Sequence, residues 1–118
     1  MDKRIVWVGQ TLKQLRAMPE DVKDEVVFAL DAAQKGRKAP YAVPMKGQLR
    51  TVTEIRVDDV GDTYRAMYTT EFEGIVYVLD VFKKKSKRGT ATPQKDIDRI
   101  LGRLKLAREH FMTLARDG

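Results

Sequence analysis

The spacing of apolar residues in the first third of the chain predicts one strand followed by two helices. Ile5–Val8 is a continuous apolar run rich in β-branched residues, which is typical of a strand buried on both faces. Gln10–Ala17 predicts a short helix, and Pro19 opens a second helix from its first turn. The apolar stripe of this second helix consists of Val22, Val26, Ala29, Leu30 and Ala33, and Gly36 ends it. We expect the two helices to form an antiparallel hairpin on one side of the fold.

The middle of the chain changes to a period of two and predicts three strands. Ala39–Leu49 contains two prolines and a glycine and is expected to be a loop. Leu49–Val57 alternates, which predicts a strand with one packed face and one polar face. Thr63–Thr70 is the next strand, and its alternation sets Tyr64, Ala66 and Tyr68 against Thr63, Arg65, Met67 and Thr69. Ile75–Phe82 is the most apolar strand and is expected at the centre of a sheet.

Helical spacing returns at the end of the chain. Thr92 is a predicted cap and Pro93 a predicted first residue of a long helix. Its apolar face consists of Ile97, Ile100, Leu101, Leu104, Ala107, Phe111 and Leu114. The order β-α-α-β-β-β-α predicts an α+β fold, in which an antiparallel meander carries the packed helices. The length of 118 residues predicts a single domain over residues 1–118.

Charge and composition narrow the choice of partner. The formal net charge is +6 and the pI is about 9.7, which favours nucleic acid, an acidic protein or an anionic membrane surface. Simple solubility is the alternative. The absence of cysteine excludes disulfides and cysteine-based zinc sites. No apolar run resembles a signal peptide or a membrane span, so we expect a soluble, cytoplasmic protein.

A basic cluster follows the most apolar strand directly. The stretch VLDVFKKKSKR runs from Val78 to Arg88, and its cations are Lys83, Lys84, Lys85, Lys87 and Arg88. Crowded ammonium groups repel one another, and a polyanion lying across them relieves that repulsion. The apolar part of the stretch fixes the cluster in the fold, so the pattern favours a nucleic-acid partner.

The residues needed for several common chemistries are missing. The one histidine, His110, lies near the end of the last helix, where a surface residue is more common than a catalytic one. No metal-ligand spacing and no glycine-rich nucleotide loop occurs, so we expect no metal and no cofactor. Nucleophile–histidine–acid hydrolysis is disfavoured because it needs a catalytic histidine, and His110 is the one histidine of the chain.

What remains is a set of cations and phenols on three consecutive strands. It comprises Arg56, Arg65 with Tyr64 and Tyr68, the lysines from Lys83 to Lys85, and Lys46 from the preceding loop. Consecutive strands of a meander are neighbours, so these side chains are able to converge on one face. The alternative is a solvated edge, in which Arg56 and Arg65 pair with Glu54 or with nearby acids.

The same residues carry a resemblance to a known family. The chain resembles the RelE/HigB-like toxins of type II toxin–antitoxin modules, and within them the phage-derived HigB-like branch. The pattern runs Leu, Glu-x-Arg, then Tyr-Arg-x-x-Tyr, then Phe-x-Lys-Lys before a helix that begins with proline. The matching residues are Leu49, Glu54, Arg56, Tyr64, Arg65, Tyr68, Phe82, Lys84, Lys85 and Pro93.

The resemblance implies a RelE-like microbial RNase fold and a metal-independent endoribonuclease that cleaves mRNA, usually at the ribosomal A site. It also implies translation inhibition, growth arrest and neutralisation by a cognate antitoxin, often a helix-turn-helix protein, within a hetero-oligomeric complex. The catalytic tyrosine or histidine that some members carry near the C-terminus has no clear counterpart in this chain.

The chemistry of RNA cleavage then suggests a role for each residue. Arg65 is the first candidate for binding the phosphate, with Arg56 on the neighbouring phosphate. Lys84 or Lys85 is expected to act as base or acid, with Lys46 as a second candidate for that role. Tyr64 and Tyr68 either stack on a base, donate a proton, or pack between strands. The residues expected to grip the RNA backbone are Lys83, Lys87, Arg88 and Arg50.

Two other functions fit the same features. A ParE-like toxin would keep this fold and inhibit DNA gyrase instead of cutting RNA. A non-catalytic nucleic-acid-binding phage regulator would bind with a steep salt dependence and cut nothing.

Overall fold

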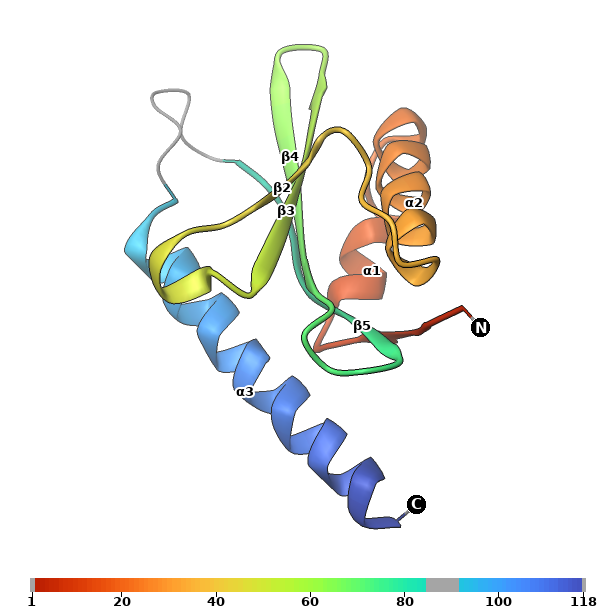
Figure 1. Ribbon diagram of the computed structural model, residues 1–118. Coiled ribbons are helices and arrows are strands. Elements are labelled where there is room, and N and C mark those ends of the chain that lie inside the picture. The colour runs from red at the N-terminus through yellow and green to blue at the C-terminus, as the bar shows by residue number, and fades with distance from the viewer. Residues whose placement is uncertain (1, 85–91, 118) are drawn as a thin grey trace.

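A five-stranded sheet lies between two layers of helices (Figure 1). This computed structural model describes residues 2–84 and 92–117. The elements are β1 (Arg4–Trp7), α1 (Thr11–Arg16), α2 (Glu20–Gln34), β2 (Ala42–Pro44), the 3-10 turn η1 (Gly47–Leu49), β3 (Val52–Asp59), β4 (Asp62–Thr69), β5 (Ile75–Lys83) and α3 (Gln94–Asp117). The strand order is β1-β5-β4-β3-β2, and only the β1–β5 pair is parallel. The predicted α+β fold with a mostly antiparallel meander is confirmed.

The two edges of the sheet differ from the sequence prediction. The first strand was expected to be buried on both faces, but β1 is an edge strand and is only partly buried. The predicted loop Ala39–Leu49 contains β2 and η1, so it is not entirely irregular. β2 is short and ends at a proline, which is tolerated at an edge because it leaves no ladder hydrogen bond unmade inside the sheet. β5 pairs with β1 and β4 and is therefore an interior strand, as predicted.

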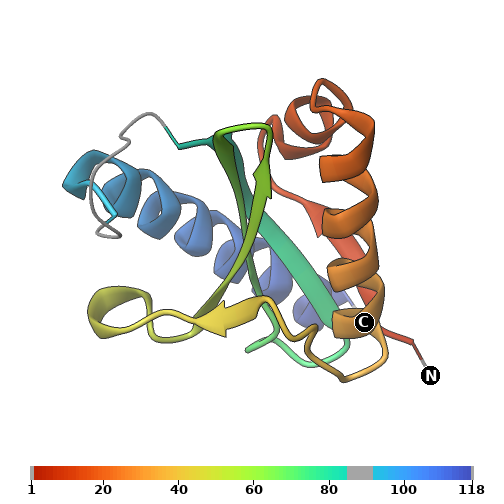
Figure 2. The same cartoon turned by 90° about the horizontal axis from the view of Figure 1, so that it is seen from above.

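Each face of the sheet has its own apolar core. Figure 2 shows that helices lie on both sides of the sheet. The predicted hairpin of α1 and α2 covers one face, where Leu15, Val22 and Leu30 pack on Val57 and Val78. On the other face α3 covers the sheet, and its core includes Val52, Met67, Tyr77, Leu79, Ile100 and Leu104. Among the described helices, none combines the length and the apolar character needed to cross a membrane.

Because α3 covers the second face, the face of β3 that was predicted to be polar, which carries Val52, Glu54 and Arg56, is largely buried. Val52 is fully buried and Glu54 is 9% exposed, although the alternation had assigned both to the polar side. A carboxylate at this depth needs a positive partner, because removing a charge from water is costly. The partners of Glu54 define the site described below.

The hairpin between β3 and β4 carries a strained residue. Asp59 pairs with Asp62, so Val60 and Gly61 form a two-residue loop with φ of 46° and 82°. A β-branched residue is disfavoured at positive φ, whereas asparagine followed by glycine suits this turn.

Val60→Asn is therefore expected to stabilise the protein by about 1 kcal/mol, since the side chain is 95% exposed and loses no packing. Thermal unfolding measures the change as a rise in Tm of a few degrees. Val43→Asn is the control, because Val43 is also an exposed valine but lies in an edge strand. A Tm that falls for Val60→Asn would contradict the assignment of strain.

Candidate functional site

Three cations from neighbouring strands share the face of the sheet that α3 covers. Arg56 lies directly opposite Arg65 in the β3–β4 register, and Arg65 lies opposite Phe82 of β5. Lys84 follows two residues after Phe82, and its backbone N–H donates to the carbonyl of Thr63 over 2.7 Å. Like charges placed directly opposite each other destabilise a sheet. The arrangement therefore needs a compensating anion.

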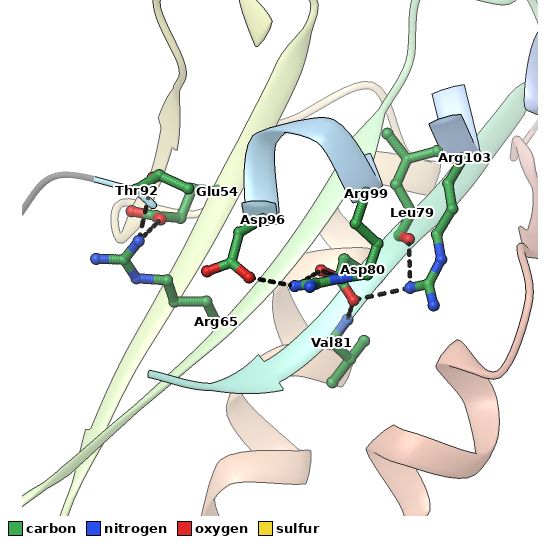
Figure 3. Close-up of polar contacts among 9 residues, drawn as sticks. All are labelled: Glu54, Arg65, Leu79, Asp80, Val81, Thr92, Asp96, Arg99 and Arg103. Carbon is green, nitrogen blue, oxygen red and sulfur yellow. Dashed lines mark hydrogen bonds and ion pairs between the residues drawn. The ribbon is translucent and has the colours of Figure 1, made fainter. Parts of the chain in front are cut away.

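Glu54 supplies that anion (Figure 3). One carboxylate oxygen lies 3.3 Å from Nη1 of Arg65, as Figure 3 shows. The other lies 3.6 Å from Nη2 of Arg56. Nη1 of Arg65 also donates to the hydroxyl of Thr92 over 3.2 Å, just before α3. The Arg65 side chain is 0% exposed. The pairing with Glu54 that we considered as the alternative is thus present, but it is buried instead of solvated.

These neighbouring charges shift the pKa of Lys84. Its pKa is lowered by desolvation first and then by the positive charges of Arg65 and Arg56, while Glu54 and Asp58 act in the opposite direction. A lysine with a lowered pKa is neutral at a pH closer to neutrality than an ordinary lysine, so it can accept a proton there. Lys84 therefore stays a candidate base, although desolvation, and not the neighbouring cations, is the first cause of its lowered pKa.

A pocket of about 1180 Å³ opens beside these cations. Its lining comes from α1, the β3–β4 turn, the first half of β4, the second half of β5 and the start of α3, and includes Arg65, Phe82, Lys83, Lys84, Lys95 and Arg99. Among the described residues three acidic side chains also line it, and all three are held in ion pairs: Asp62 with Lys83, and Asp80 and Asp96 with Arg99. The pocket is large enough for a nucleotide, and among the described residues five cations and three carboxylates line it.

A buried carboxylate that the sequence reading overlooked joins α3 to β5. Asp80 is 1% exposed, and Arg99 donates to its Oδ2 from Nε over 2.9 Å and from Nη2 over 2.7 Å. Arg103 donates to Oδ1 over 2.8 Å and to the carbonyl of Leu79 over 3.0 Å (Figure 3). Arg99 also pairs with Asp96 at 2.8 Å and lies over the ring of Phe82. The sequence signal was an aspartate inside an apolar run together with two arginines one helical turn apart.

Several predicted residues lie elsewhere. Tyr64 and Tyr68 point to the opposite face, where Tyr68 is buried in the core beneath α1 and α2 and burial raises its pKa. The structure therefore does not bring the two phenols to Arg65. Lys46 and Arg50 are exposed on either side of η1 and do not line the pocket. Lys83 pairs with Asp62 at 3.2 Å on the rim.

Three further predictions, Lys85, Lys87 and Arg88, lie outside the described residues. Within residues 2–84 and 92–117, no group of three potential ligands is placed to hold a metal ion. His110 lies in α3, and its Nδ1 is hydrogen-bonded to the hydroxyl of Tyr77 over 2.8 Å.

Comparison with solved structures identifies the fold. The chain is similar to a chain of the RelBE2 toxin–antitoxin complex from Mycobacterium tuberculosis, with a TM-score of 0.51 and 17% sequence identity. The match covers 71% of this chain and 100% of the other. At this identity the similarity establishes a shared architecture, so the fold is that of RelE-type toxins, as predicted.

The sequence itself places the chain in a family. Residues 13–105 match the family described as phage-derived protein Gp49-like (DUF891), so the chain belongs to the Gp49-like family. Among curated proteins, no sequence is similar enough to count as a relative. The predicted phage-derived character is confirmed, whereas membership of the HigB-like branch stays a prediction.

Proposed function

We propose that this protein is the toxin of a type II toxin–antitoxin system and that it inhibits translation by cutting mRNA. Family and fold support the toxin class. The observation that carries the proposal is the group of Arg56, Arg65 and Lys84 around Glu54, next to the pocket. Arg56 and Arg65 outnumber the one carboxylate of Glu54, so the group keeps a positive charge that suits a phosphodiester even when Lys84 is neutral. Such a group destabilises the empty sheet, which is a reason to look for its role in binding an anion.

In the proposed reaction the 2′-oxygen of RNA attacks its own adjacent phosphorus. The bond from the 2′-oxygen to phosphorus forms, the bond from phosphorus to the 5′-oxygen breaks, and the products are a 2′,3′-cyclic phosphate and a 5′-hydroxyl. Neutral Lys84 accepts the proton of the 2′-hydroxyl, and water supplies a proton to the departing 5′-oxygen. No electrons are exchanged and no metal is required.

The burial of Arg65 changes the role suggested for it. Lys84 is partly exposed and lines the pocket, so it contacts the phosphate directly, whereas Arg56 is 35% exposed but does not line this pocket and acts on the phosphate through its charge. Arg65 lies below them and contributes positive charge to the developing phosphorane, while its ion pair fixes Glu54. Fixed charges of this kind act strongly where water is excluded.

The proposal includes the partners of the toxin. A cognate antitoxin, of helix-turn-helix type by the sequence resemblance, would neutralise the protein in a hetero-oligomeric complex. The similar solved structure is itself a toxin–antitoxin complex. The substrate is mRNA on the ribosome in the cytoplasm.

Two reactions separate this function from its rivals. The purified protein is added to a cell-free translation reaction and, in parallel, to DNA gyrase with relaxed plasmid. We expect translation to stop and supercoiling to continue. Loss of supercoiling with normal translation would favour the ParE-like reading, and an effect on neither would leave a binding protein.

The pH dependence of cleavage tests the role of Lys84. Glu54 raises the pKa of Lys84, so Glu54→Gln lowers that pKa further. A base with a lower pKa loses its proton at lower pH, so the rising limb of the rate–pH profile should shift to lower pH. Single-turnover cleavage of a short RNA across a pH series measures the shift.

Asp58→Asn is the matched control, because Asp58 acts on Lys84 in the same direction but is the last of its causes. Its shift should have the same sign and be smaller. A shift of the Glu54→Gln profile to higher pH would contradict the assignment of Lys84 as base.

A further inference from the structure

The pocket contains a second group of residues that the proposed reaction does not use. Arg99 lies over the ring of Phe82, with its central carbon 5.3 Å from the ring centroid. Phe82 is the register partner of Arg65, so this pair lies one strand away from the proposed phosphate site. Both residues line the same pocket as Lys84. A base is attached to its phosphate through one sugar, so a nucleotide bound at Lys84 has its base near this pair.

The polar contacts of the Arg99 guanidinium lie along the edge of the planar group, so they do not occupy the face on which a base could stack. Nε and Nη2 donate to Asp80, and Nη2 also contacts Asp96 on the first turn of α3. Figure 3 shows Arg99 between these two carboxylates. Bonds at the edge fix the orientation of a planar group, and Phe82 supports one side of it. A fixed, planar cation beside an aromatic ring is a surface on which nucleobases stack.

Comparison with Arg103 argues against a purely structural role for Arg99. Both arginines bind the buried carboxylate of Asp80. The side chain of Arg103 is 18% exposed and does not line the pocket, whereas that of Arg99 is 36% exposed and does. Arg99 thus presents an exposed part of its side chain to the pocket, which Arg103 does not.

From this geometry we infer that Arg99, backed by Phe82, is a stacking platform for a nucleobase of the bound RNA, and that it favours purines. Purines present the larger ring surface to a planar cation, so they gain more from stacking. The inference rests on the proposed function, because it assumes that the adjacent cations hold an RNA phosphate. It adds a subsite that selects the base beside the cut.

The test uses 2′-O-methyl RNA trinucleotides, which lack the attacking hydroxyl and therefore cannot be cleaved. One has adenine at the central position, one has uracil and one is abasic there. We expect the wild-type protein to bind the adenine RNA about ten-fold more tightly than the abasic RNA, with uracil between them. Fluorescence anisotropy gives the three dissociation constants.

Arg99→Lys keeps the positive charge and removes the plane, and should reduce the adenine-to-abasic ratio below about three-fold. Arg103→Lys is the matched control, because the same substitution at the same carboxylate should leave the ratio unchanged. Thermal unfolding of both variants measures how much each substitution destabilises the fold. A loss of stability alone should not change the adenine-to-abasic ratio. Phe82→Leu should lower the adenine-to-abasic ratio, whereas Phe82→Tyr, which keeps an aromatic ring, should leave it at the wild-type value.

The outcomes distinguish a failure of the stacking platform from a failure of the proposed function. Cleavage of ribosome-bound mRNA is followed in parallel with unmodified RNA. If the wild-type protein cuts mRNA but binds adenine and abasic RNA equally, or if Arg99→Lys keeps the wild-type ratio, the stacking platform is refuted alone. If the protein neither cuts mRNA nor binds any trinucleotide, the proposed function and the platform both fail.

Discussion

Lys84→Gln is expected to slow RNA cleavage by at least about 100-fold without unfolding the protein, which is the usual effect of removing a general base. Glutamine keeps much of the length of the side chain and cannot accept the proton of the 2′-hydroxyl. The side chain is only partly buried, so its loss creates no large cavity. Single-turnover cleavage rates for the purified variant and the wild type provide the measurement.

Lys38→Gln is the control for charge alone, because Lys38 is exposed and does not line the pocket. It removes the same positive charge and should change the rate less than two-fold. If Lys84→Gln cleaved RNA at the rate of this control, proton transfer would have to be assigned to another residue.

Asp80→Ala is expected to lower the free energy of unfolding by about 3 kcal/mol, because it leaves Arg103 without its carboxylate partner and Arg99 with Asp96 alone. Asp80 is 1% exposed and is the only carboxylate that Arg103 is seen to contact among the described residues. Arg99 retains Asp96 and some solvent contact, which places the loss toward the lower end for broken buried pairs. Denaturant unfolding measures the difference.

Asp62→Ala provides the comparison. Asp62 pairs with Lys83 at the rim, where the two side chains are 38% and 55% exposed, so its loss should cost less than about 1 kcal/mol. Equal losses for the two variants would show that Asp80 does not hold α3 to β5.

The secondary structure was largely predictable because its signals are local. Alternation and helical spacing gave the meander, the hairpin of α1 and α2, and the final helix. The errors lie where long-range packing decides the outcome. Glu54 looks solvated in a period-two pattern, and only the position of α3 shows that it is buried. β2 was missed because a three-residue strand ending at Pro44 has no alternation to detect.

Only part of the site was predictable from the sequence. Register brings Arg56, Arg65 and Lys84 together, and the order of strands in a meander implies as much. The grouping of Tyr64 and Tyr68 with Arg65 ignored the alternation within β4, which sends them to the other face. The contact of Arg99 with Asp80 spans 19 residues and depends on how α3 crosses the sheet, which no local pattern encodes.

The central claim is that the cations on the α3 face cut RNA by attack of its own 2′-hydroxyl. Ribosome-bound mRNA is incubated with the purified protein, the new 5′ ends are mapped by primer extension, and their chemistry is tested with polynucleotide kinase. We expect discrete ends that carry a 5′-hydroxyl and that disappear with Lys84→Gln. Intact mRNA with folded wild-type protein, or ends that carry a 5′-phosphate, would contradict the account.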